Sequence, residues 1–172
     1  MNKSIVLTVI ADDQPGVIKT VSAVLDSHRG NWTQSSMSSL AGQFAGILLV
    51  SVPGENADAC VEELHALERV GLRVIAHVGS AASHIGETHV YELNLVGNDR
   101  KGIVHDITTV LTRHNVNVNN LESVVESASM GGGELFKANA QLIVPAGADI
   151  DALEEELEDL ANELMVDITF RQ

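Results

Sequence analysis

The amino-acid sequence contains one pattern twice. When the 172-residue chain is displaced by 86 positions, residues 7–31 lie over residues 93–117 without a gap. Further along, the offset grows to 92, and the additional residues fall in SASMGGGE, residues 127–134, which predicts a longer hairpin turn in the second copy. Such internal similarity predicts that one small fold occurs twice. The identical pairs in the first segment are Leu7 and Leu93, Asp13 and Asp99, Gly16 and Gly102, Val24 and Val110, Leu25 and Leu111, His28 and His114, and Asn31 and Asn117.

Each copy has the same order of predicted strands and helices. Residues 5–10 and 90–96 are apolar or alternate between apolar and polar, which is typical of strands. Residues 16–28 and 102–114 then place an apolar stripe along one side of a helix. The remaining elements are predicted as strands at 32–40, 44–52, 118–127 and 135–144, helices at 56–69 and 149–163, and closing strands at 72–78 and 165–171.

The order β-α-β-β-α-β predicts an α+β fold made of two ferredoxin-like βαββαβ units in tandem. We expect the first domain at residues 1–78 and the second at residues 89–172. The segment between them, GSAASHIGET at residues 79–88, has no periodicity and is predicted to be a linker.

Alternation along the strands predicts which side chains face the helices. In the second copy this set is Leu93, Leu95, Leu142, Val144, Val166 and Ile168, and the alternating positions are polar. In the first copy the set is Leu7, Val9, Leu48, Val50, Val74 and Ala76, but the alternating positions are largely apolar: Val6, Thr8, Ile47, Leu49, Arg73 and Ile75. A contiguous apolar face usually marks an interface. We therefore expect this face to be buried, either by self-association or a regulatory partner, or by another part of the same chain.

The turn between the first strand and the first helix of each copy is a candidate binding site. It reads DDQPGV at residues 12–17 and NDRKGI at residues 98–103. The first amides of a helix have no intrahelical partner, and with the helix dipole they can receive a carboxylate. Glycine lets a ligand approach the backbone, and neighbouring Asp or Asn oxygens could accept from an ammonium group. The pattern suits a free amino acid, with plain helix capping by Asp and Pro as the alternative.

The sequence DDQPGVIKTVSAVL resembles the ACT domain, in which D-x-P-G-V occupies this turn. NDRKGIVHDITTVL is a weaker match, because Lys101 replaces the usual proline. The tandem layout is similar to the glycine cleavage system transcriptional repressor family. That resemblance implies a regulator that senses glycine or another small amino acid and acts through a DNA-binding protein partner. By the same resemblance, ligand contacts fall on Asp12, Asp13, Gly16 and Val17 and on Asn98, Asp99, Gly102 and Ile103, with Asn31 and Asn117 as secondary candidates that could instead be turn residues.

Charge argues against direct binding to nucleic acid. The chain has 24 acidic and 10 basic residues, a net charge of −14, and only 3% aromatic residues. This charge repels phosphates, and few aromatic rings are present to stack on bases. A transcriptional role would therefore need a partner. A regulatory subunit of a metabolic enzyme, which would bind a catalytic chain, is the competing interpretation, and a homo-oligomer is compatible with either.

The motifs of common enzymes are missing from the sequence. The seven histidines form no HExxH motif, and neither G-x-S-x-G nor a phosphate-loop motif occurs. His28 and His114 end the first helices, where a structural role is expected, with ligand binding as the alternative. The single cysteine, Cys60, lies in a helical pattern and is expected to be structural. No stretch resembles a membrane span or a signal sequence. We expect a cytoplasmic, non-catalytic protein without a metal or cofactor.

Overall fold

The computed structural model describes residues 1–79 and 86–172, and it divides the chain into two compact units. The division falls between residues 80 and 85. Most of the predicted linker, residues 79–88, therefore lies outside the described residues. Each unit is described by itself below.

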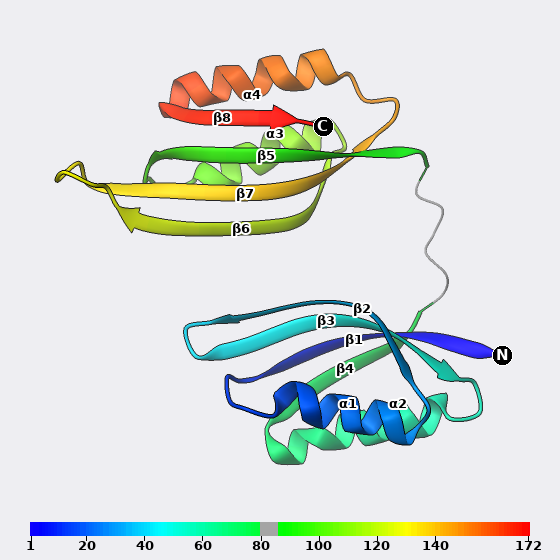
Figure 1. Ribbon diagram of the computed structural model, residues 1–172. Helices are drawn as coiled ribbons and strands as arrows, with labels where there is room; N and C mark the ends of the chain where they lie inside the picture. Colours follow the sequence, from blue (N-terminus) through cyan, green and yellow to red (C-terminus); the bar gives the residue numbers. More distant parts are fainter. Residues whose placement is uncertain (80–85) are drawn as a thin grey trace. The chain divides into compact units, whose positions relative to one another are not determined.

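The first unit is an antiparallel sheet with both α-helices on one face (Figure 1). The strand order is β2-β3-β1-β4, so that β3 and β1 lie inside the sheet and β2 and β4 form its edges. The predicted helix at 56–69 is an α-helix followed by a 3-10 helix, which ends at Gly71 in the left-handed conformation. The elements are β1 (Asn2–Asp12), α1 (Val17–Ser27), β2 (Asn31–Leu40), β3 (Gln43–Pro53), α2 (Ala57–Ala66), the 3-10 helix η1 (Leu67–Val70) and β4 (Leu72–Val78).

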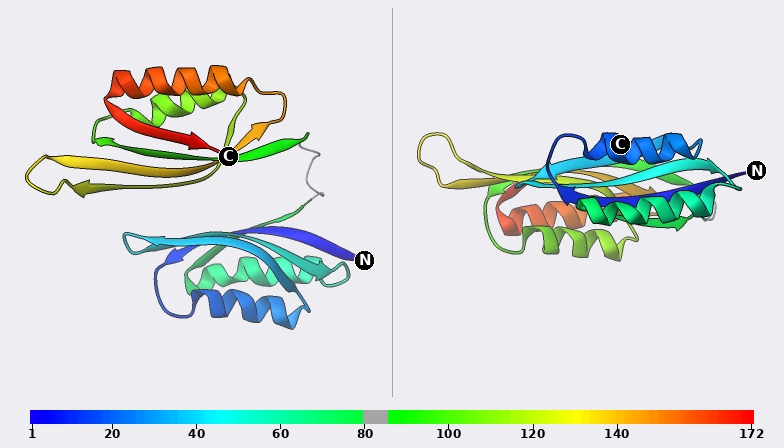
Figure 2. Two further views of the ribbon diagram at one scale, coloured as in Figure 1. Left: turned by 45° about the horizontal axis from the view of Figure 1, so that its top comes forward. Right: turned by 90° about the horizontal axis from the view of Figure 1, so that it is seen from below.

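The second unit repeats this arrangement with strand order β6-β7-β5-β8. Its two helices again cover one face of the sheet, and the long β6–β7 hairpin extends past them (Figure 2). The prediction of an α+β fold with two ferredoxin-like units is confirmed. Several predicted bounds differ by a few residues, and β5 begins inside the predicted linker. The elements are β5 (Thr88–Asn98), α3 (Ile103–Arg113), β6 (Asn117–Ser127), β7 (Glu134–Pro145), α4 (Ile150–Leu164) and β8 (Val166–Arg171).

The predicted helix-facing side chains form the two cores. Leu7 and Leu48 are fully buried in the first unit, as is Leu142 in the second. Ala76 and Ile168 are partly buried against the same cores. Burying aliphatic side chains in this way supplies most of the stabilisation of such small units, at about 25 cal/mol for each Å² of apolar surface. The strand parity inferred from the sequence is therefore confirmed.

The two free sheet faces differ as the sequence predicts. In the first unit Ile47 is 57% exposed and Ile75 is 45% exposed. In the second unit the corresponding face is polar, and Asn139 Nδ2 donates a hydrogen bond to Asn94 Oδ1. The charge is also uneven, because residues 1–79 hold 5 basic and 8 acidic residues and residues 86–172 hold 5 basic and 16 acidic residues. The first unit is thus the less charged of the two and exposes the more apolar sheet face.

Candidate functional site

The two strand–helix turns have the same backbone geometry. In the first, the Asp13 amide donates to the Gly42 carbonyl at 2.9 Å, and Gly16 precedes α1 with φ 100° and ψ −4°. In the second, the Asp99 amide donates to the Glu134 carbonyl at 2.9 Å, and Gly102 precedes α3 with φ 93° and ψ −3°. Each helix therefore begins directly after a left-handed glycine, where an L side chain would be strained.

Neither helix is capped by a side chain. No side chain accepts a hydrogen bond from the first turn of α1 or of α3 within the described part of the chain. By contrast, Asp149 caps α4 by accepting a hydrogen bond from the Ala152 amide at 3.1 Å. Plain capping by Asp13, the alternative explanation of the motif, is wrong, because Gly16 occupies the N-cap position. The first amides of α1 and α3 can therefore receive an external acceptor.

The aspartates of the first turn contact the β2–β3 hairpin. Asp13 Oδ2 accepts a hydrogen bond from Ser39 Oγ at 2.5 Å, and Asp12 Oδ1 accepts one from Gln43 Nε2 at 2.8 Å. The contact between Asp12 and Gln43 follows from the sheet register, which places these two residues directly opposite each other. Each contact uses one carboxylate oxygen and leaves the other oxygen available to accept from an ammonium group.

Ser39 and Gln43 were not among the residues that the sequence motif identified. They lie 26 and 31 residues from their carboxylate partners, and only the pairing of β1 with β3 and of β3 with β2 brings them to the turn. A sequence signal existed in the predicted strand pairing, because antiparallel pairing of residues 5–10 with 44–52 brings the hairpin turn beside the first strand's end.

The second turn has a different electrostatic environment. Asp106 lies in the first turn of α3, and its Oδ2 would lie 3.8 Å from a Cβ atom at Gly102. The first turn of α1 carries no acidic residue, and Thr20 occupies the matching position, where its hydroxyl donates to the Gly16 carbonyl. A carboxylate near helix amides disfavours a second anion there. In this respect the start of α1 is more favourable for a carboxylate than the start of α3.

The remaining sequence candidates lie in three different environments. Val17 and Ile103 are buried in the two cores, so only their backbone can face a ligand at the turn. Asn98 ends β5 and is exposed, opposite Leu135. Asn31 and Asn117 begin β2 and β6, after the far ends of α1 and α3, so each unit places them away from its own turn.

The glycines at the turns serve first to allow the backbone conformation. A Cβ atom at Gly16 would meet no atom within 4 Å, so the space in front of this residue is open. The expectation that glycine admits a ligand is compatible with this space, but the positive φ alone already explains why glycine stands at both positions.

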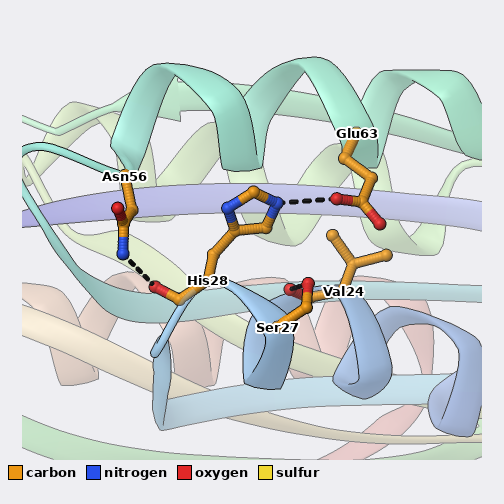
Figure 3. Close-up of polar contacts among 5 residues, drawn as sticks. All are labelled: Val24, Ser27, His28, Asn56 and Glu63. Atoms are coloured by element: carbon orange, nitrogen blue, oxygen red, sulfur yellow. Dashed lines mark hydrogen bonds and ion pairs between the residues drawn. The ribbon is translucent and has the colours of Figure 1, made fainter.

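The repeated histidines have structural contacts. His28 Nε2 lies 2.7 Å from Glu63 Oε2, and Asn56 Nδ2 donates to the His28 carbonyl at 3.0 Å (Figure 3). In the second unit His114 Nε2 lies 3.3 Å from a Glu156 carboxylate oxygen. Each histidine thus connects the end of its unit's first helix to the second helix, in agreement with the structural role expected from the sequence.

Cys60 is fully buried. Burial, with a smaller contribution from nearby Glu63, raises the pKa of this thiol above its ordinary value, so it stays protonated and unreactive. Over the ranges 1–79 and 86–172, no group of three or more His, Cys, Asp or Glu side chains is arranged to hold a metal ion. In those same ranges, no helix has the length and apolar character needed to cross a membrane.

Comparison with known proteins identifies the fold family. No curated protein matches the sequence. The crystal structure of an unknown protein from Galdieria sulphuraria is similar over 99% of this chain and 98% of its own, with a TM-score of 0.88 and 27% identity. A candidate glycine cleavage system transcriptional repressor is similar over 99% of this chain and 97% of its own, with a TM-score of 0.68 and 20% identity. The model of the ACT domain matches residues 3–74 and again residues 93–171. The chain therefore belongs to the ACT-domain family of regulatory domains, with one ACT domain in each of its two units.

Proposed function

We propose that this protein is a non-catalytic sensor of a small free amino acid that regulates transcription through a DNA-binding protein partner. The observation that carries the proposal is the uncapped start of α1, where Gly16 leaves open space in front of the first helical amides. Asp12 and Asp13 belong to the same strand–helix turn, so groups suited to both ends of an amino acid occur in one turn.

The chemistry at the first turn suits a zwitterion. The ligand carboxylate would accept from the amides at the start of α1, where the helix dipole is positive. The ligand ammonium would donate to the carboxylate oxygens that Ser39 and Gln43 leave free. Glycine is the first candidate, because the resemblance to the glycine cleavage repressor family and the name of the similar solved structure both point to it.

The first turn is the stronger candidate for occupancy. Its helix lacks an acidic residue in the first turn, whereas Asp106 stands near Gly102 in the second unit. The second turn keeps its backbone geometry and remains a candidate of lower affinity, with Asn98 and Asp99 as its polar groups.

Calorimetric titration of the purified chain with the common amino acids tests the ligand. We expect binding of a small amino acid, and we expect Gly16→Asn to weaken it by about tenfold or more, since its side chain would enter the open space. Asparagine tolerates a positive φ, so this change separates blocking from backbone strain. The matched change Gly102→Asn should weaken binding less. Trp32, the single tryptophan, reports whether the first unit stays folded. If neither variant changes affinity, the site lies elsewhere.

We expect the partner protein, and not this chain, to bind the DNA. At a net charge of −14, the purified chain should not shift the mobility of promoter DNA at physiological salt. A gel-shift titration at about 0.15 M salt measures this, and the partner protein serves as the positive control. Sequence-specific binding by the chain alone would contradict the partner-dependent mechanism.

The apolar free face of the first sheet is the proposed docking surface for that partner. An enzyme subunit is the competing partner, because an ACT domain pair could equally control a catalytic chain. Affinity capture from native lysate separates the two, since recovery of a DNA-binding protein supports the proposal and recovery of a metabolic enzyme supports the alternative.

A further inference from the structure

We propose that the outer edge of the second sheet, formed by β8 together with α4, binds an extended basic segment of a protein partner. The segment adds its backbone to β8 and places arginine or lysine side chains in a hollow beside α4. None of the residues that carry this inference belongs to the strand–helix turns or to the free face of the first sheet. It therefore does not rest on amino-acid sensing.

A hollow of about 250 Å³ lies between α4 and β8. Leu157 at its base is buried, whereas Glu154 and Glu158 are exposed. Apolar walls with carboxylates at the opening suit a long basic side chain, whose methylene groups pack on apolar surface while its charged end pairs with an acid. The hollow is lined by Glu154, Leu157, Glu158, Ile168, Thr169 and Phe170.

The two glutamates of the hollow are available to a cation. They stand four residues apart on α4, so their side chains are neighbours and repel each other. Within residues 1–79 and 86–172, neither Glu154 nor Glu158 forms an ion pair. By contrast, Glu156 has carboxylate oxygens 3.3 Å from nitrogen atoms of both Arg113 and His114. A cation between Glu154 and Glu158 would therefore relieve a repulsion that the fold leaves uncompensated.

Strand β8 is an open edge beside this hollow. Among the described strands it pairs with β5 alone, and α4 runs along it on the helix-covered face (Figure 1). About half of the residues in an edge strand direct their N–H and C=O groups outward, where an incoming strand can pair with them. The edge is six residues long, so it accommodates a short segment. Alternate side chains of that segment would lie over the hollow.

The spacing of the two glutamates matches an extended segment. Residues four apart are separated by about 6 Å along a helix axis. Alternate residues of a strand are separated by about 7 Å. Two basic residues with one residue between them can therefore each reach one carboxylate, the first at Glu154 and the second at Glu158. The expected partner sequence is thus basic-x-basic.

Charge favours the same kind of partner. Helix α4 contains seven acidic residues and no basic residue, and residues 86–172 hold 16 acidic against 5 basic residues. Arg171, the basic residue of β8, alternates with Ile168 and Phe170 and is in register with Glu92, so it lies on the face away from the helices. Opposite charge on a partner accelerates its association and orients it.

The corresponding edge of the first unit has a different chemistry. When buried Cys60 and Leu64 of α2 are aligned with buried Leu153 and Leu157 of α4, Val61 and His65 fall at the positions of the two glutamates. Val61 packs against the first core. The edge formed by β4 and α2 thus has no carboxylate at either position, and the inference concerns the second unit alone.

Calorimetric titration of the full chain with a synthetic peptide tests this inference. The probe has eight residues of alternating arginine and valine with blocked ends, at about 0.15 M salt. We expect binding, and we expect Glu154→Gln together with Glu158→Gln to weaken it by about tenfold or more, because two charge-assisted contacts are lost. The matched control is Glu155→Gln with Asp159→Asn, which removes equal charge at equal spacing outside the hollow and should have less than about a twofold effect. Tyr91 reports whether the second unit stays folded.

A second peptide and hydrogen exchange test the extended conformation. In the order Arg-Arg-Val-Val, repeated once, no two arginines are two positions apart, so we expect affinity lower by about fivefold or more at the same charge. The alternating peptide should slow amide exchange in β8. Lack of binding, equal affinity for both peptides, equal effects of the two double variants, or slowed exchange at β6 in place of β8 would overturn the proposal. Tighter binding of free spermidine would also overturn it, since the hollow would then be a site for small cations.

Discussion

Replacing Gly97 with valine is expected to destabilise the second unit strongly and leave the first intact. A Cβ atom at this position would lie 2.3 Å from Val166 Cγ1, 2.7 Å from Val166 Cβ and 3.1 Å from Val166 Cα. Gly97 is directly opposite Val166 in the β5–β8 pairing, so the clash involves backbone and the stiff β-branched carbon. Separation of the central strand β5 from the edge strand β8 would cost about 3 kcal/mol or more, a large part of the stability of a small domain.

Each unit contains its own optical reporter for this experiment. Trp32, the single tryptophan, lies in the first unit, and Tyr91, the single tyrosine, stacks on Phe170 in the second at 4.6 Å between ring centres. In thermal unfolding we expect the tyrosine signal of Gly97→Val to be lost at least about 10 °C below that of the wild type. The tryptophan transition should stay in place.

Gly46→Ala is the matched control for the clash at Gly97. Its Cβ atom would lie 2.5 Å from Met37 Cγ, whose flexible side chain can shift, and no closer than 3.2 Å to Met37 Cβ and the Ser36 carbonyl oxygen. We expect a smaller loss of stability there, in the first unit. Coincident melting of Gly97→Val and the wild type would show that β5 and β8 are not packed as closely as described.

Changing Ile47 and Leu49 together to aspartate is expected to abolish partner binding without unfolding the protein. Both side chains point to the free face of the first sheet, where Thr8 and Val6 lie opposite them on β1. Neither is in the helix-covered core, so the cost to folding should be about 1 kcal/mol for each, from strand propensity. Two charges buried in an apolar contact would instead be costly, so we expect affinity to fall by about a hundredfold or more.

The repeat supplies a control of equal charge. Asn139 and Gln141 occupy the positions in the second sheet that match Ile47 and Leu49. The double change of Asn139 and Gln141 to aspartate adds the same charge on a face that is already polar. It should leave partner capture and sedimentation unchanged. If both double variants, or neither, lose the partner while staying folded, the free face of the first sheet is not the docking surface.

Local sequence pattern was sufficient to predict most of the fold. Strand alternation and helical stripes depend on residues two to four positions apart, so the order of elements, the helix-facing residues and the contrast between the two free faces could be read directly. The repeat strengthened each assignment, since an element predicted once was predicted again at a known offset. Boundaries were less certain, as at β5, which begins before the predicted strand because pairing with Pro145 extends it.

For the candidate site, the sequence and the tertiary structure each determined a different part. The sequence by itself determined where the two turns lie, that each contains a glycine, and which acidic or amide side chains stand nearby. Only the tertiary structure decided that Asp13 accepts from Ser39 and does not cap α1, and that Gln43 lies beside Asp12. These outcomes depend on contacts between residues far apart in the chain, whose distances are set by sheet register and side-chain volume and not by any local pattern.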